Sequence, residues 1–232
     1  LMQSQAGIRI NKYLADKKYA TRKGADELIR QGRVSINGKR ANLGDKVSPA
    51  DSVEVRAPQQ QFRYFAYHKP RGVLTHSAQA GETDIAAATN LRGLFPVGRL
   101  DKDSSGLIIL TDDGRLTHAL LDPAHEHEKE YDVRTTTVLP KNFKRRMERG
   151  LDIGGYRTKK CTVKIFGEHH FAVVLTEGKK HQIRRMCGNL GQAVSQLKRT
   201  RIMNIKLGVQ KPGVHRALQG AELREFLASV GL

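Results

Sequence analysis

The stretch Val97-Gly-Arg-Leu-Asp-Lys-Asp-Ser-Ser-Gly-Leu-Ile-Ile-Leu-Thr111 decides the fold of the larger part of this chain. Its first half is polar and carries Asp101, and its second half is the apolar run 107–110, which turn residues follow. This pattern predicts a buried strand. A carboxylate at the entrance to a buried strand is held rigidly and partly out of water, which suits a nucleophile or an acid–base group. Asp101 is therefore the first candidate catalytic residue.

The composition points to a polyanionic partner. With 232 residues the chain has room for two unequal domains, and its formal net charge is +18. Such a surplus favours nucleic acid over a merely basic, soluble surface. There is no apolar run of about 18 residues, no secretory signal and no zinc-ligand spacing, and Cys161 and Cys187 lie far apart. We therefore expect a cytoplasmic protein with reduced thiols, no metal and no membrane span.

The N-terminal part predicts a small helical and hairpin module. Apolar residues recur at helical spacing around Leu14, and Thr21 is a good N-cap for a second helix that ends at Gly32. The pair Asn37-Gly38 then signals a tight hairpin. Cations outnumber acids here, which favours phosphate contact over a simply solvated face. The candidate RNA-binding residues are Arg22, Lys23, Arg33, Lys39 and Arg40.

This segment resembles the S4 RNA-binding domain. The matching residues are Arg9-Ile-Asn-Lys-Tyr-Leu14, Thr21-Arg22, Ala25, Leu28-Ile29, Gly32-Arg-Val34 and Ile36-Asn-Gly38. We expect an S4-like domain at 1–57, a turn-prone linker at 58–61 and a second domain at 62–232.

The second domain is expected to be of the α+β class, with a mixed and mainly antiparallel sheet. Strand patterns occur at 63–67, 107–110, 128–138, 161–165, 171–175 and 200–207. Helical patterns occur at 85–88, 114–121, 140–150 (a basic segment), after Gly178 and at 222–230.

By residue type alone, the loop of Asp101 allows three interpretations. It imitates the spacing of a calcium loop, but Pro96 and Gly98 stand where the entering helix should be. Asp101 and Asp103 could be paired carboxylates of a glycosidase, although nothing in the sequence raises the pKa of either. The third possibility is a structural turn, in which aspartates bond local amides.

Four ordered blocks resemble the RsuA/RluB/RluE/RluF family of ribosomal-RNA pseudouridine synthases. They are Tyr64-Phe-Ala-Tyr-His-Lys-Pro-Arg-Gly72, Gly98-Arg-Leu-Asp101 with Ser105-Gly-Leu-Ile-Ile-Leu-Thr111, Lys129-Glu-Tyr131, and Glu177-Gly-Lys-Lys-His-Gln-Ile-Arg-Arg-Met186. The resemblance spans almost the whole chain and is greatest to the RluF branch. Two positions depart from the family pattern, His68 and His215.

The resemblance implies a role for each site residue. Asp101 is then the essential carboxylate, Arg184 its partner, and Tyr131 the ring that stacks on a flipped uracil. Ile183 and Leu197 would form the apolar wall of the pocket, and Arg99 would contact RNA or support the loop. The alternatives are that Tyr131 is only a core residue and that Arg184 is only a charged residue on the surface of a helix.

The resemblance also implies an activity. The expected reaction is the conversion of a uridine to pseudouridine in large-subunit ribosomal RNA, by a monomer without a cofactor. Transfer RNA stays open as a second substrate. The alternative is a non-catalytic S4-type RNA-binding or ribosome-associated factor.

Overall fold

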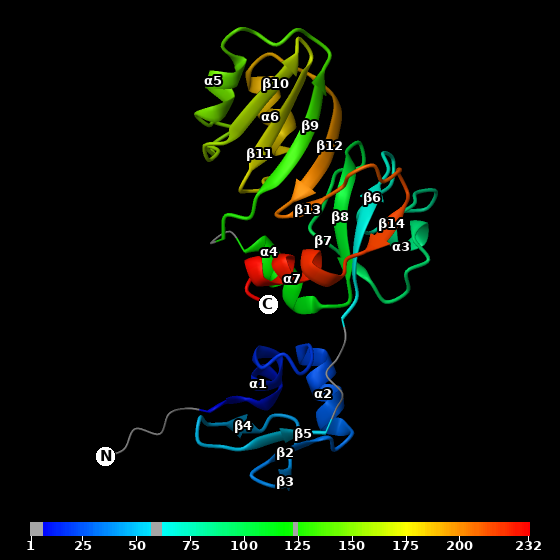
Figure 1. Ribbon diagram of the computed structural model, residues 1–232, viewed down its shortest axis with the longest axis vertical. Helices are drawn as coiled ribbons and strands as arrows, with labels where there is room; N and C mark the ends of the chain where they lie inside the picture. The colour runs from blue at the N-terminus through cyan, green and yellow to red at the C-terminus, as the bar shows by residue number, and fades with distance from the viewer. Residues whose placement is uncertain (1–6, 57–61, 123–124) are drawn as a thin grey trace, which may run out of the picture. The chain divides into compact units, whose positions relative to one another are not determined.

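The computed structural model describes residues 7–56, 62–122 and 125–232 (Figure 1). The chain divides into two compact units, Leu1–Phe62 and Arg63–Leu232. The linker expected at 58–61 lies outside the described residues. No helix of the described ranges has the length and apolar character needed to cross a lipid bilayer.

The first unit is built from two helices and short strands, as the sequence predicts. Thr21 caps the second helix, because its side chain accepts a hydrogen bond of 3.1 Å from the amide of Gly24. Asn37 and Gly38 both have positive φ, 50° and 77°, which is the conformation that a tight hairpin needs. The elements are β1 Ile8–Arg9, α1 Ile10–Asp16, α2 Arg22–Arg30, β2 Val34–Ile36, β3 Lys39–Arg40, β4 Lys46–Val47 and β5 Val53–Val55.

The second unit is a mixed sheet with helices. Its strands run in the order β10-β11-β9-β12-β8-β6-β14, and only the β12–β8 pair is parallel. Two short strands lie off this path, with β13 beside β12 and β7 beside β8. The strands are β6 Tyr64–Lys69, β7 Phe95–Val97, β8 Ser105–Thr111, β9 Lys129–Thr135, β10 Thr162–Gly167, β11 His170–Leu175, β12 Val194–Ile202, β13 Ile205–Lys206 and β14 His215–Ala217. The helices are α3 Ile85–Ala88, α4 Gly114–Leu121, α5 Phe143–Glu148, α6 Gln182–Asn189 and α7 Gly220–Ser229.

The parallel contact joins the two halves of this sheet through only two residue pairs. Lys198 lies opposite Ser105, and Arg199 lies opposite Gly106. A Cβ atom on Gly106 would stand 2.3 Å from the carbonyl oxygen of Arg199 and 2.5 Å from its nitrogen. Gly106 also has a φ of 113°, which L side chains rarely adopt. Glycine is therefore required where β8 begins.

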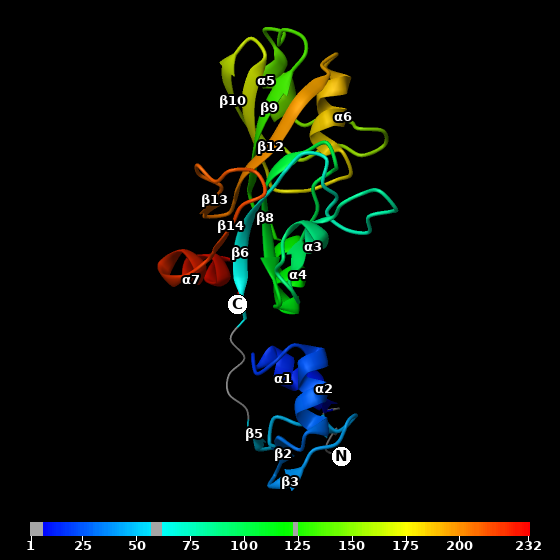
Figure 2. The ribbon, with the colours of Figure 1, turned by 90° about the vertical axis from the view of Figure 1, so that its right-hand side faces the viewer.

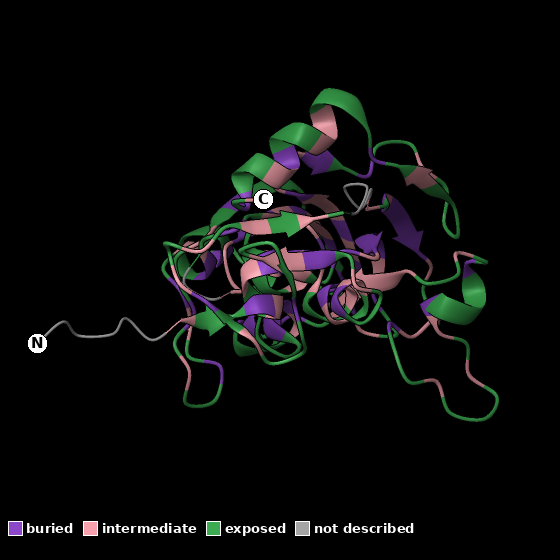
Figure 3. Cartoon of the chain, turned by 90° about the horizontal axis from the view of Figure 1, so that it is seen from below, coloured by how far each residue is buried: buried purple, intermediate pink, exposed green. Residues whose placement is uncertain are grey.

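One face of the β10-β11-β9-β12 half is covered by helices. Phe143 and Met147 of α5 and Met186 of α6 pack on Val133 and Phe171 of the strands. Figure 2 shows α6 beside β12, and Figure 3 shows buried and exposed residues alternating along strands and helices. The alternation expected for the hairpin 161–175 is confirmed for β11, where Phe171, Val173 and Leu175 are buried, but in β10 only Val163 is buried and Ile165 is exposed.

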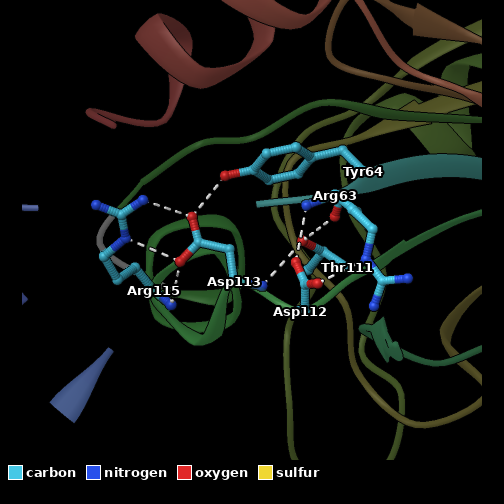
Figure 4. Close-up of polar contacts among 6 residues, drawn as sticks. All are labelled: Arg63, Tyr64, Thr111, Asp112, Asp113 and Arg115. Atoms are coloured by element: carbon cyan, nitrogen blue, oxygen red, sulfur yellow. Dashed lines mark hydrogen bonds and ion pairs between the residues drawn. The ribbon is translucent and has the colours of Figure 1, made fainter. Parts of the chain in front are cut away.

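A buried carboxylate fixes the far end of β8 (Figure 4). Asp113 is fully buried and accepts hydrogen bonds from the Tyr64 hydroxyl at 2.6 Å and from the Arg115 guanidinium at 2.7 and 2.8 Å. Burial alone would raise the pKa of Asp113, but these hydrogen bonds outweigh it and hold the pKa below its usual value. The carboxylate also caps α4 by accepting from the amide of Arg115. Strands β6 and β8 and helix α4 are thereby tied together.

Three expectations of secondary structure were wrong. The strand expected at 200–207 is the end of β12, which reverses at Met203 with a φ of 50° before β13 begins. The basic helix expected at 140–150 spans only Phe143–Glu148. Strand β6 does not stop at His68 but continues through Lys69, because both residues pair with β8, His68 opposite Leu107 and Lys69 opposite Gly106.

Candidate active site

The loop that carries Asp101 connects β7 to β8 and is clamped from one side. Thr75 donates a hydrogen bond of 2.7 Å to the carbonyl of Leu100 and accepts one of 3.1 Å from its amide. The amide of Ser104 closes a turn by donating to the carbonyl of Asp101 at 3.0 Å. The Asp101 side chain is 38% exposed, so it is held by its neighbours and still open to a ligand.

Two basic residues lie near this carboxylate. Nε2 of His181 lies 3.4 Å from Oδ1 of Asp101 and forms an ion pair when the ring is protonated. The backbone of His181 is left-handed, with a φ of 51°, immediately before α6. A non-glycine residue in this conformation is uncommon and is often found at functional sites. The motif His181-Gln-Ile-Arg184 predicts a role for Arg184 but none for His181 itself.

A second cation, Lys69, is buried beside the loop. Its Nζ donates to the carbonyls of Pro70 at 2.9 Å and Val73 at 2.6 Å. Burial lowers the pKa of Lys69 to about 8, and the negative charges of Asp101 and Asp103 oppose that shift.

Arg184 supports the loop rather than the carboxylate. Its guanidinium donates to the carbonyl of Asp103 at 3.2 Å, to the Ser104 hydroxyl at 3.4 Å and to the carbonyl of Val194 at 3.2 Å. Among the ion pairs of the described residues, the partner of Asp101 is His181 and not Arg184. The expected direct pairing therefore needs correction, because Arg184 is used to join α6 and β12 to the loop.

The expected base-stacking residue, Tyr131, lies in strand β9. Tyr131 is half-buried, lies opposite Arg199 in the sheet and packs against the core cluster that contains Ile183 and Leu197. Arg199 in turn lies opposite Gly106, two residues beyond the loop. The structure thus gathers Tyr131, Ile183 and Leu197 on the helix-covered face near the entrance of β8.

Two cationic residues in this region, one buried and one half-buried, were assigned no role from the sequence. Arg199 is buried and donates from Nε to the carbonyl of Leu107 at 2.7 Å, while its Nη2 is buried without a partner among the described residues. Lys129 donates to the carbonyl of His127 at 3.0 Å. Its pKa is lowered to about 8, first by burial and then by the charge of Arg199. Lys129 stands between Glu128 and Glu130, and Arg199 between Lys198 and Thr200, so no apolar pattern predicted that either would be buried.

The remaining candidate residues lie elsewhere. Arg99 is exposed on the loop, two positions before Asp101. In the first unit the five expected RNA-binding cations are exposed. One of them, Arg40, also donates a hydrogen bond of 2.9 Å to the carbonyl of Arg30 at the end of α2. These five are Arg22, Lys23, Arg33, Lys39 and Arg40.

The alternatives for the loop fit less well. A calcium loop needs an entering helix, and strand β7 stands there instead. Within the described ranges, no three His, Cys, Asp or Glu side chains are grouped to hold a metal ion. Asp103 is 70% exposed and pairs with Arg71 at 3.8 Å, so it lies in water rather than facing Asp101 as a second buried acid.

Comparisons with known proteins agree with this geometry. Residues 63–189 match the family model described as RNA pseudouridylate synthase, and residues 8–53 match the S4 domain. The chain is 40% identical over 230 residues to the dual-specificity RNA pseudouridine synthase RluF of Escherichia coli K12, covering 96% of this chain and 79% of that protein. It is 32% identical to ribosomal large subunit pseudouridine synthase B of Bacillus subtilis, covering 95% and 96% of the two chains.

A solved structure supports the fold. A crystal structure of pseudouridylate synthase superposes with a TM-score of 0.68 at 27% identity, covering 96% of this chain and 99% of that one. The α+β fold class, the N-terminal S4 domain and the enzymatic rather than purely binding character expected from the sequence are confirmed. The chain therefore belongs to the RNA pseudouridine synthases, enzymes that isomerise uridine within RNA, and carries an S4 domain before its catalytic domain.

Proposed function

We propose that this enzyme isomerises one uridine of large-subunit (23S) ribosomal RNA and that Asp101 is its essential carboxylate. The observation that supports this proposal is the placement of Asp101, a partly exposed carboxylate on a loop that Thr75 and Arg184 hold by hydrogen bonds. Nε2 of His181 lies 3.4 Å from this carboxylate, and buried Lys69 is nearby. Each version of the reaction requires a carboxylate that is held in place and that the substrate can reach.

The reaction itself balances without an added reagent. The bond between N1 of uracil and C1′ of ribose breaks, a bond from C5 to C1′ forms, C5 loses a proton and N1 gains one. The enzyme must therefore hold the detached base while it turns. We assign this role to Tyr131 by stacking, with Ile183 and Leu197 as the apolar wall.

Arg184 acts in this proposal as a positioning residue. It joins the loop to α6 and to β12, so its loss would move Asp101 without removing any charge from the reacting atoms. Arg99 and the S4 cations would contact RNA phosphates, which supply salt-sensitive affinity more than choice of site.

The decisive experiment compares Asp101→Asn with Asp103→Asn. The second variant is a matched control, because Asp103 is a neighbouring aspartate on the same loop that is 70% exposed. Unmodified 23S transcript is incubated with each protein, and pseudouridine is mapped by mass spectrometry. Asp101→Asn should form none, while Asp103→Asn should retain most of the wild-type rate. Full activity of Asp101→Asn would refute the role of this carboxylate.

Transfer RNA is the second substrate class that we propose, in keeping with the dual specificity named for the Escherichia coli relative. The same assay on bulk unmodified transfer RNA tests it. Pseudouridine in 23S transcript alone would restrict the enzyme to ribosomal RNA. If wild-type protein bound RNA but modified neither class, the non-catalytic RNA-binding factor would be the better description.

A further inference from the structure

The β10-β11-β9-β12 half of the sheet leaves its second face open. Side chains that lie opposite each other on neighbouring strands point to the same side. Phe171, Val133 and Leu197 form one such row, which faces the helices and is buried. The neighbouring rows belong to the other side, and their members are exposed or intermediate: Lys164, Ala172, Asp132 and Lys198 in one row, His170, Arg134 and Gln196 in the next.

This open face ends at the active-site loop. Lys198 lies opposite Ser105, the first residue of β8. The row that begins at Lys164 on the edge strand therefore crosses the sheet to the residues directly after Asp101. It spans the four strand-to-strand steps from β10 to β8, or about 19 Å at about 4.8 Å a step. A few nucleotides of an RNA chain cover that distance.

A phenylalanine stands at the far end of the open face. Phe166 of β10 is 51% exposed. Its ring centroid lies 4.9 Å from that of His170, and Nζ of Lys164 lies 5.3 Å from its centroid. Both neighbours belong to the open face, so the ring lies on that side as well. A large exposed apolar side chain on an edge strand promotes association unless it has a partner.

Between Phe166 and the loop the face is hollow and mostly basic. A cavity of about 380 Å³ is lined by Arg71, Arg134 and Lys198 together with Asp103 and Asp132. The two acids are already engaged, Asp103 with Arg71 at 3.8 Å and Asp132 with His170 at 2.7 Å. The cations that remain give the hollow the charge that a phosphate backbone requires.

We propose that this open face binds a single-stranded segment of the RNA substrate and that Phe166 stacks on one of its unpaired bases. The inference rests on the proposed function, because the same RNA strand would place its target uridine at Asp101. An open sheet with an aromatic ring and flanking cations is an arrangement that binds unpaired nucleotides, since every base offers a ring face. Lys164 then contacts the adjoining phosphate, and Arg134 and Lys198 contact phosphates of the RNA backbone closer to the loop.

The chain offers a direct spectroscopic test, because it contains no tryptophan. Phe166→Trp creates a single indole on the open face, and a base stacked on it quenches its fluorescence. The control is Ala228→Trp on the exposed side of α7, at the opposite end of the catalytic unit from β10 (Figure 1). Titration with unmodified 23S transcript should quench the indole at 166 and leave the one at 228 nearly unchanged. Equal quenching at both positions, or none at 166, overturns the proposal.

Steady-state kinetics provides the second test. Phe166→Ala should raise KM for the transcript about 10-fold, equivalent to about 1.4 kcal/mol, with kcat little changed. Phe166→Tyr should restore KM, because it keeps the ring. Ile165→Ala is the matched control, since Ile165 is 42% exposed on the same strand and alternates to the other side. An unchanged KM for Phe166→Ala, or an equal rise for Ile165→Ala, overturns the proposal.

These outcomes test the proposed function and the stacking surface independently. If wild-type protein forms no pseudouridine in 23S transcript while the indole at 166 is still quenched, the proposed substrate is wrong and the stacking surface stands. If pseudouridine forms normally and neither the quenching nor the KM effect occurs, the stacking surface is wrong and the proposed function stands.

Discussion

Replacing Gly106 by alanine should separate the two halves of the catalytic sheet. The added Cβ would meet the Arg199 backbone at 2.3 and 2.5 Å, whereas ordinary contacts begin near 3.4 Å, so about 1 Å of movement is needed. Strand β12 resists this movement, because β9 pairs with it along most of its length. Strand β8 is held from its other side by β6.

The magnitude follows from two costs. Overpacking against backbone costs about 1 to 3 kcal/mol. Forcing an L residue to a φ of 113° costs about another 1 to 3 kcal/mol. We therefore expect the free energy of unfolding of the catalytic unit to fall by about 2 to 6 kcal/mol, a large share of a typical total of about 5 to 15 kcal/mol. Pseudouridine formation should fall as well, because Asp101 lies just before this joint.

Urea unfolding followed by circular dichroism measures the effect, and Gly155→Ala is the matched control. Gly155 also has a positive φ, 80°, but a Cβ there would meet nothing within 4 Å. It therefore carries a conformational cost without the clash. Were Gly106→Ala to lose no more stability than Gly155→Ala, the close approach of β8 and β12 would not be the reason for this glycine.

Three further predictions concern single groups. Tyr64→Phe removes the 2.6 Å hydrogen bond to buried Asp113 and should lower the free energy of unfolding by about 1 to 2 kcal/mol in urea titrations; no loss would mean that Arg115 alone satisfies the carboxylate. Lys69 has its pKa lowered from 10.5 to about 8, so the folded state binds fewer protons than the unfolded state between these values. The stability of wild type relative to Lys69→Met should therefore rise from pH 8 to 10.5, and a flat difference would contradict the shift. Thr21→Ala removes the N-cap of α2 and should cost the S4 unit about 1 kcal/mol by thermal unfolding, whereas Thr21→Ser should cost much less.

The elements that the sequence predicted well depend on neighbours in the chain. The cap at Thr21, the Asn37-Gly38 turn and the helix Gly114–Leu121 each follow from residues within a few positions of one another. The apolar run 107–110 predicted a buried strand correctly, because a strand covered on both sides cannot alternate. The motif blocks also predicted the family correctly.

Other features depend on register and loop paths that no local pattern encodes. The contact of His181 with Asp101, the bonds of Arg184 to the loop carbonyl and the parallel pairing of β12 with β8 join residues about 80 to 90 positions apart. Local sequence determines what each segment can form, because its hydrogen bonds and apolar spacing are short-range. Tertiary packing determines which charges meet, because that depends on how distant strands align.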